Sequence, residues 1–211
     1  MDEDQAKQWL TQKLNVSRET IDRLNELRAA VVDEANHQNL VSAATIPHFW
    51  ARHIVDSAQL LPLSQSAGAG TWLDLGTGAG FPGMVMALLS PRPMILVESR
   101  RKRYEFLRQL AGKLKLPHVS VHGGRLETLE TRMVSVISAR AFAPLPKLLD
   151  LAARFSRNET LWLLPKGRSA KDELALIDHT WHGKFHINRS LTDENAAILI
   201  GSGISRRKQA S

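Results

Sequence analysis

The feature that most constrains the fold is a regular alternation of short apolar segments with helical segments from residue 71 onward. Strand, helix and strand at this spacing predict a parallel β-sheet covered by helices on both faces. Two later stretches, KFHINRSL (184–191) and AAILIGSG (196–203), predict a terminal hairpin at the sheet edge. The segments expected to form parallel strands are TWLDL (71–75), MILVE (94–98), HVSVH (118–122), VSVIS (134–138) and TLWLL (160–164).

The residues before the first strand show a helical pattern instead. Residues 17–35 carry apolar side chains at spacings of three and four, with Ser17 placed as the N-cap, and this predicts an amphipathic helix. A shorter helix is expected over 3–13 and a third over 46–61. The chain is therefore expected to comprise a helical segment (1–63), an α/β domain (64–204) and a basic flexible tail (205–211).

The chain carries an excess of positive charge. Lys and Arg number 28 against 21 Asp and Glu, which gives a formal net charge of +7. Such an excess indicates an anionic partner, and nucleic acid is the commonest one. Two basic runs, 99–103 and 205–209, predict phosphate contacts. Within them, the residues expected to contact RNA are Arg101, Lys102, Arg206 and Arg207.

Several kinds of protein are disfavoured by what the sequence lacks. The chain has no cysteine, which excludes disulfides and thiolate-ligated zinc, and its eight histidines show no metal-ligand spacing. We therefore expect no metal site. No apolar run approaches the ~18 residues typical of a membrane-spanning helix, and the polar N-terminus is unlike a secretory signal. We expect a cytoplasmic protein with no membrane partner.

A glycine-rich turn follows the first predicted strand, in the stretch LDLGTGAGFPG at 73–83. From Gly76 it reads G-x-G-x-G, whereas from Gly78 it reads G-x-G-x-x-G through Gly80 and Gly83. The second spacing matches the dinucleotide fingerprint, and the first is compatible with other nucleoside cofactors. Glycines are needed in such a turn because a Cβ would prevent the backbone from approaching a ligand closely. The turn alone does not decide which cofactor is bound.

Two carboxylates narrow the choice of ligand. Asp74 precedes Gly76 by two residues, and a carboxylate there repels a pyrophosphate but suits a cation such as S-adenosylmethionine. Glu98 ends the second strand 98 − 76 = 22 residues after Gly76, close to the spacing at which an acidic residue binds a ribose diol. Glu98 supports a nucleoside ligand without choosing one. An NAD-linked oxidoreductase, another methyltransferase and an RNA-binding protein with a vestigial pocket therefore remain alternatives.

The sequence resembles the RsmG family, also called the glucose-inhibited division protein B family, along most of its length. No single motif suffices for this resemblance, but seven occur in the family's order. They are NLVSA (39–43), RHIVDSAQL (52–60), LDLGTGAGFPG (73–83), ESRRKRYEFLRQL (98–110), GGRLETL (123–129), VISARAFAPL (136–145) and LLPKGR (163–168). The segment before residue 39 is less distinctive.

The resemblance implies a class I methyltransferase fold, with a Rossmann-like sheet of seven strands whose last strand is antiparallel. It also implies methyl transfer from S-adenosylmethionine to N7 of a guanine in the 530 loop of 16S rRNA, in the small ribosomal subunit. We expect a monomer. The cofactor contacts that it implies fall on Gly76, Phe81, Leu126, Glu127 and Arg140, to which the reasoning above adds Asp74, Gly78, Gly80 and Glu98.

Further residues of the resembling motifs are candidates for the acceptor side. Arg52 and His53 belong to the N-terminal signature and are candidates for RNA contact, as is Lys166. Pro165 precedes Lys166 and fixes the local backbone, so Lys166 is expected to be presented differently from its counterparts. Arg140 follows the fourth strand, where a guanidinium suits either the cofactor carboxylate or the target base.

The implied reaction fits the residues that the chain contains. N7 of guanine carries no proton, so it attacks a methyl group without a general base. The protein must instead align the reacting atoms, which can contribute about 7–11 kcal/mol. Arg140 is therefore expected to act in catalysis by positioning rather than by proton transfer. Methylation of pyrimidine C5, which usually needs a cysteine nucleophile, is excluded because the chain has none.

Overall fold

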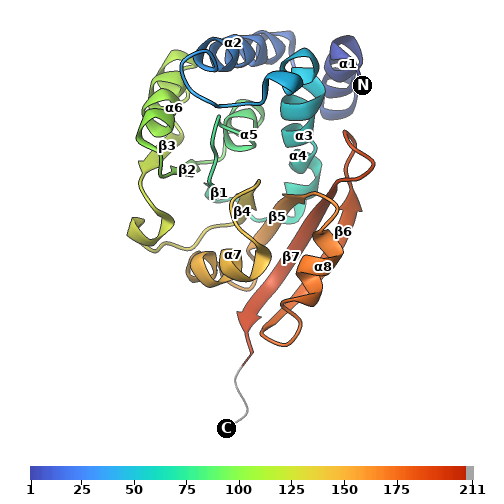
Figure 1. The fold of residues 1–211 in the computed structure, drawn as a ribbon, viewed down its shortest axis with the longest axis vertical. Helices are drawn as coiled ribbons and strands as arrows, with labels where there is room; N and C mark the ends of the chain where they lie inside the picture. Colours follow the sequence, from blue (N-terminus) through green and yellow to red (C-terminus); the bar gives the residue numbers. More distant parts are fainter. Residues whose placement is uncertain (208–211) are drawn as a thin grey trace.

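The computed structural model describes residues 1–207 and contains one seven-stranded sheet with the strand order β3-β2-β1-β4-β5-β7-β6 (Figure 1). The first five strands are parallel, whereas β7 runs antiparallel to both of its neighbours. This confirms the class I methyltransferase fold. The strands are β1 (Trp72–Leu75), β2 (Met94–Glu98), β3 (Val119–Gly123), β4 (Val136–Ala139), β5 (Leu161–Lys166), β6 (Trp181–Arg189) and β7 (Ala197–Arg206).

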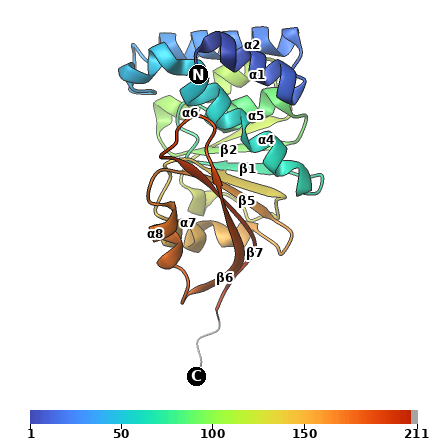
Figure 2. The same cartoon turned by 90° about the vertical axis from the view of Figure 1, so that its right-hand side faces the viewer.

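Helices cover both faces of the sheet, as Figures 1 and 2 show. Side chains alternate along each strand, so Trp72 of β1 packs into one apolar cluster and Leu73 into the other. The first cluster includes the N-terminal helices together with α5 and α6, and the second includes α7. The main helices are α1 (Glu3–Leu14), α2 (Arg18–Glu34), α5 (Gly83–Leu89), α6 (Arg101–Lys113), α7 (Leu145–Ala152) and α8 (Ala170–Ala175).

The first two predicted helices are confirmed. The backbone N–H of Thr20 donates to the Ser17 hydroxyl over 3.2 Å, so Ser17 is the N-cap of α2. Leu24, Leu27 and Val31 are fully buried and attach α2 to the core beside α5. The N-terminal segment is therefore part of the main core.

The prediction of one continuous helix over 46–61 is wrong. The segment is instead a 3-10 helix (Ala43–His48), a π-helix η2 (Trp50–Val55) and two short helices, α3 (Asp56–Ala58) and α4 (Leu60–Leu63). Pro47 lies inside the 3-10 helix, and a proline has no N–H to donate to a regular helix. π-helical turns often occur at functional sites, and η2 carries Arg52 and His53.

The boundary expected for the basic tail is also wrong. Ser205 and Arg206 are the last residues of β7, and Arg206 pairs with Trp181 in the sheet. Arg206 Nη2 also contacts Asp150 Oδ1 at 2.8 Å. The sheet and this ion pair therefore hold Ser205 and Arg206, which were predicted to belong to a flexible tail. The rest of that predicted tail, 208–211, lies outside the described residues.

No helix within residues 1–207 is long and apolar enough to span a membrane. The same part of the chain contains no group of three His, Asp or Glu side chains that could hold a metal ion.

Replacing Leu27 with alanine should lower the free energy of unfolding by about 2–5 kcal/mol, because it leaves a cavity where α2 meets the core. Urea unfolding of Leu27→Ala measures this loss. Glu26→Ala, on the exposed face of the same helix, is the control and should change stability by less than about 0.5 kcal/mol. Equal effects of the two substitutions would contradict the docking of α2.

Candidate active site

The glycine-rich loop lies at the point where the strand order of the sheet reverses, between β1 and β4. The chain leaves β1 for α5 on one face of the sheet, whereas it leaves the neighbouring β4 for α7 on the other face. Ligands of open α/β sheets bind beyond the carboxyl ends of the strands at such a switch point. The fold therefore places residues 76–82 at the position where a ligand is expected.

The loop takes a conformation that favours glycine. Gly76, Gly78 and Gly80 have φ angles of 63°, 59° and 99°, which L side chains rarely adopt. A Cβ at Gly76 would also lie 2.6 Å from Cδ2 of Phe142. The loop is thus packed closely on one side while its backbone follows a path that only glycine takes without strain.

Asp74 lies beneath this loop and is fully buried. Its Oδ2 accepts from the backbone N–H of Gly83 over 3.0 Å, and its Oδ1 accepts from the Ser138 hydroxyl over 2.6 Å. Burial raises the pKa of Asp74 to about 6, against the opposing effects of these hydrogen bonds and of the charge on Arg140. The sequence alone places this carboxylate against the ligand, whereas in the structure both of its oxygens bind the protein.

Glu98 holds the same loop from the end of β2. Its Oε2 accepts from the backbone N–H of Gly78 over 3.1 Å, and its Oε1 accepts from that of Arg100 over 2.8 Å. The side chain is nearly buried. Leu126, which is buried, and Glu127, which is exposed, lie in a short 3-10 turn after β3. The residues predicted to bind the cofactor thus follow three adjacent strands, with the exception of Arg140.

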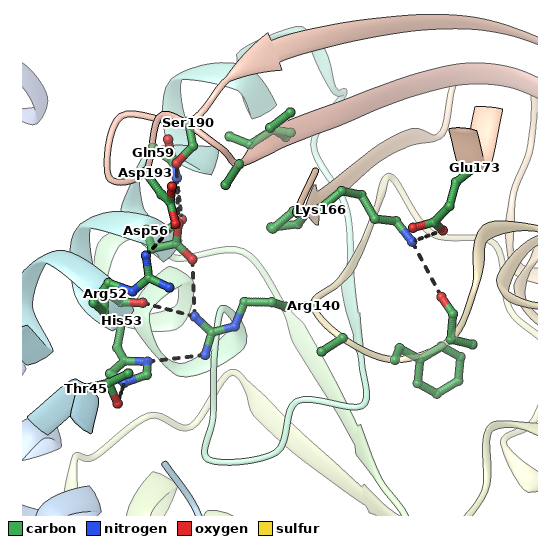
Figure 3. A pocket seen from close by; sticks show the side chains of 18 of the residues that line it. Thr45, Arg52, His53, Asp56, Gln59, Arg140, Lys166, Glu173, Ser190 and Asp193 are labelled. Carbon is green, nitrogen blue, oxygen red and sulfur yellow. Dashed lines mark hydrogen bonds and ion pairs between the residues drawn. The ribbon is translucent and has the colours of Figure 1, made fainter. Parts of the chain in front are cut away.

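Arg140 lies on a second, adjoining feature, a cavity of about 860 Å³ beyond the ends of β4 and β5 (Figure 3). The ionisable residues of the lining come from η2 and α3, from the chain after β4, from the end of β5, from α8 and from the β6–β7 turn. They are Arg52, His53, Asp56, Arg140, Lys166, Glu173 and Asp193. The structure therefore brings four predicted residues, Arg52, His53, Arg140 and Lys166, to one site.

Every arginine and lysine of this lining is paired with a carboxylate. Arg140 Nη1 lies 3.2 Å from Asp56 Oδ2, Arg52 Nη1 lies 2.8 Å from Asp193 Oδ2, and Lys166 Nζ lies 2.7 Å from Glu173 Oε2. The side chain of Lys166 is only 10% exposed. Its ammonium group therefore binds the partly buried carboxylate of Glu173, and this geometry does not favour the RNA contact predicted for Lys166.

His53 connects the cavity to the glycine-rich loop. Its ring stacks on that of Phe81, with centroids 5.0 Å apart and planes at 24°. Burial, reinforced by the charges of Arg140 and Arg52, lowers the pKa of His53 to about 3. Because Arg140 Nη2 donates to Nδ1 over 3.4 Å, the ring proton is assigned to Nε2, which lies 2.9 Å from Thr45 Oγ1. His53 is thus a neutral acceptor at neutral pH.

The other predicted RNA contacts lie elsewhere. Arg101 and Lys102 are exposed at the start of α6, close in sequence to Glu98 and the cofactor residues. Arg206 ends β7 and Arg207 follows it, whereas the cavity is lined by Ala197 and Ile198 at the other end of that strand. The basic residues therefore form separate groups rather than one patch.

The sequence reasoning missed part of the cavity. Arg52, Asp56 and Gln59 are spaced by four and three residues, which is a helical signal for a shared face. No such signal relates them to the turn between β6 and β7. The backbone N–H of Leu191 nevertheless donates to Gln59 Oε1 over 2.9 Å, and the hydroxyl of Thr192 donates to Asp56 Oδ1 over 2.8 Å.

Solved structures with a similar fold are S-adenosylmethionine-dependent methyltransferases and related proteins. One, described as a SAM-dependent methyltransferase from Aquifex aeolicus, superposes with a TM-score of 0.57 at 14% identity, covering 74% of this chain and 92% of its own. At this identity the likeness establishes the fold alone. The protein thus has the architecture of the class I methyltransferases.

Sequence similarity is far more specific. The family described as "GidB: rRNA small subunit methyltransferase G" matches residues 20–196. A relative from Sphingopyxis alaskensis, named ribosomal RNA small subunit methyltransferase G, is 52% identical over 96% of this chain and 87% of its own length. A relative of the same name from Novosphingobium aromaticivorans is 50% identical over 98% and 90% of the two chains. The chain belongs to the GidB family of rRNA small subunit methyltransferases.

The buried state of Asp74 predicts a distinctive dependence of stability on pH. Its pKa is raised from 3.8 to about 6, so the native state binds this proton more tightly than the unfolded chain does. The stability present below pH 4 is therefore lost as the pH rises through 6, by about 3 kcal/mol for this group.

Urea unfolding of the protein and of Asp74→Asn across pH 4 to 7 tests this dependence. The stability difference between them should move in favour of Asp74→Asn by up to that amount as the pH rises, because all other titrations cancel. A difference that does not change with pH would contradict the assignment.

Proposed function

We propose that this protein transfers the methyl group of S-adenosylmethionine to N7 of a guanine in the 530 loop of 16S rRNA. Membership of the GidB family supports rRNA methylation, and the resemblance of its motifs to that family supports the base and the loop. The structural observation that carries the proposal is the contact between the two candidate ligand sites. Phe81 of the glycine-rich loop stacks directly on His53 of the cavity.

The loop after β1 fits the cofactor. A Cβ at Gly78 would meet no atom closer than 3.8 Å, an ordinary contact distance, so the loop leaves room beside its backbone there, whereas side chains of the protein pack against Gly76 and Gly80. Glu98 lies at the end of β2, where an acidic side chain binds a ribose diol. Unlike Asp74 it is not fully buried, and each of its oxygens keeps a second lone pair beside the backbone N–H that it already accepts. Leu126 and Glu127 complete this side after β3. When bound, S-adenosylmethionine supplies an electrophilic methyl group on a cationic sulfur.

Asp74 acts on this side by positioning. Its hydrogen bonds to Gly83 and Ser138 join the start of α5 to the end of β4. The loop is thereby held in place before the ligand arrives, and this preorganisation reduces the entropy that binding costs. The direct contact with a cationic ligand is not needed for this role.

The cavity fits the acceptor base. Its volume of about 860 Å³ is within the range of sites that enclose small organic ligands. Because N7 of guanine has no proton to lose, the site needs no base, and a neutral His53 held by hydrogen bonds is consistent with that. The task of the surrounding side chains is alignment.

The remaining positive charge serves the RNA backbone. Arg52 at the cavity and Arg101 and Lys102 on α6 are exposed and flank the two ligand sites. Arg206 and Arg207, at the opposite end of β7, would contact phosphates distant from the target base. The helical segment 1–63 and the domain 64–204 act as one unit, since the cavity takes Arg52 from the first and Arg140 from the second. We infer a monomer that acts in the cytoplasm, where its RNA substrate is found.

Methyl transfer from labelled S-adenosylmethionine tests the function directly. The protein is incubated with small ribosomal subunits and with protein-free 16S rRNA, and the modified nucleotide is mapped. We expect label at N7 of one guanine in the 530 loop. Label at another position or atom would contradict the site, and RNA binding without any transfer would contradict the activity.

Replacing Glu98 with alanine should weaken S-adenosylmethionine binding by about 1–3 kcal/mol, because a charged acceptor for the diol and an anchor of Gly78 are lost together. Isothermal calorimetry measures the change. Glu130→Ala, which removes an exposed carboxylate outside the site, is the control. An affinity unchanged by Glu98→Ala would show that the ribose is held elsewhere, and tight binding of NAD in place of S-adenosylmethionine would contradict the cofactor.

A further inference from the structure

The guanidinium group of Arg140 is held from one side only. Nη1 contacts Asp56 Oδ2 at 3.2 Å and the backbone oxygen of Arg52 at 3.4 Å, while Nη2 contacts His53 Nδ1 at 3.4 Å. Figure 3 shows these three contacts converging from η2 and α3. Within residues 1–207, the Nε–H and the second N–H of Nη2 have no acceptor. Three of the five donors of Arg140 therefore fix the side chain and two remain for a ligand.

The free edge of Arg140 lies beside the place where methyl transfer must occur. The Cζ atom is 5.3 Å from the centroid of the Phe81 ring, in the glycine-rich loop. Arg140 also follows β4, the strand next to β1 in the sheet. A base that presents N7 to the loop brings its neighbouring substituent at position 6 to this edge, because N7 and that substituent share one side of a purine.

Arg140 offers a ligand oriented N–H donors rather than a net positive charge. Asp56 already neutralises the guanidinium, and the Arg140 side chain is only 26% exposed, compared with 45% for Arg52 at the same cavity. An anionic phosphate or carboxylate would gain little attraction from a neutralised cation, whereas a neutral carbonyl oxygen needs only correctly placed N–H donors. The side chain is thus better suited to a base than to the RNA backbone.

We propose that Arg140 selects guanine over adenine by donating to O6, and that Asp56 and His53 are the positioning residues that orient it. Both purines present an N7 acceptor, but guanine places an acceptor at position 6 where adenine places an amino donor. A guanidinium contains donors alone, so it binds O6 and repels the amino group of adenine. This role rests on the proposed function and specifies how that site recognises its substrate.

Asp56, which orients Arg140, is itself held by the turn between β6 and β7. Asp56 Oδ1 accepts from the Thr192 hydroxyl over 2.8 Å and from Gln59 Nε2 over 3.0 Å, while Oδ2 accepts from Arg140. His53 accepts from Arg140 only as a neutral ring, and its burial against Phe81 and Phe49 keeps it neutral. The orientation of Arg140 is therefore fixed through groups that do not themselves face the base.

The test compares 16S rRNA carrying guanine at the mapped target position with the same RNA carrying 2-aminoadenine there. The two bases share N7 and the 2-amino group but differ at position 6. We expect the protein to methylate guanine much faster. Arg140→Gln should lower the ratio of the two rates by about 5- to 150-fold, because an amide both donates and accepts.

Controls separate base selection from other roles. Both rates are measured at saturating S-adenosylmethionine, so that any contact of Arg140 with the cofactor acts on both bases alike and cancels in the ratio. Arg157→Gln, an exposed arginine before β5, should keep the rate ratio unchanged. Asp56→Asn should lower kcat on guanine and lower the ratio without changing the cofactor Kd, and Asp56→Glu should restore part of both. A general loss of structure would instead affect all of these quantities.

Different failures have different meanings. If Arg140→Gln slows both bases equally at saturating cofactor, the inference is overturned while the proposed function stands. If the unsubstituted protein transfers no methyl group to guanine N7, the proposed function fails and the inference is overturned with it.

Discussion

The site depends on two buried carboxylates that bind the glycine-rich loop from below. Asp74 and Glu98 end adjacent parallel strands, and their oxygens accept the backbone N–H groups of Gly83 and Gly78. Gly83 opens α5, where the first N–H groups of a helix have no acceptor within the helix, and Gly78 lies in the left-handed turn before it. Unpaired buried N–H groups are costly, so the two carboxylates stabilise the path by which β1 continues into α5.

In the neighbouring cavity, carboxylates pair with cationic side chains rather than with backbone N–H groups. Its arginines and its lysine are each matched by a carboxylate within 3.2 Å, so its interior carries little net charge. Excess positive charge of the chain lies instead on exposed residues such as Lys102. Long-range attraction of RNA and short-range recognition of a base are thereby assigned to different residues. Salt should weaken the first far more than the second.

Local patterns in the sequence predicted most of the fold. The five parallel strands were predictable because each is a short, largely apolar run, and Glu98 because it ends such a run at a fixed distance from Gly76. Ser17 was predictable because an N-cap depends only on neighbours. The 46–61 segment was not, since its break into 3-10 and π turns reflects Pro47 and the packing of Phe49 and Trp50 in the core.

Properties that depend on distant partners were beyond the sequence. Lys166 reads as a free basic residue until Glu173 is placed against it, and Arg206 reads as part of a tail until β7 pairs it with Trp181. Asp74 reads as a ligand contact until Ser138 and Gly83 occupy its oxygens. Which side chains lie at the site could be predicted, but which of their atoms are free could not.

A crystal structure of the protein with S-adenosylhomocysteine and guanosine monophosphate tests the two-site arrangement most directly. The account predicts the nucleoside of the first ligand over residues 76–82 with its ribose at Glu98. It predicts guanine in the β4–β5 cavity, with N7 toward the loop and O6 at Arg140. A cofactor product bound between Arg52 and Lys166, or a guanine bound outside the cavity, would contradict it.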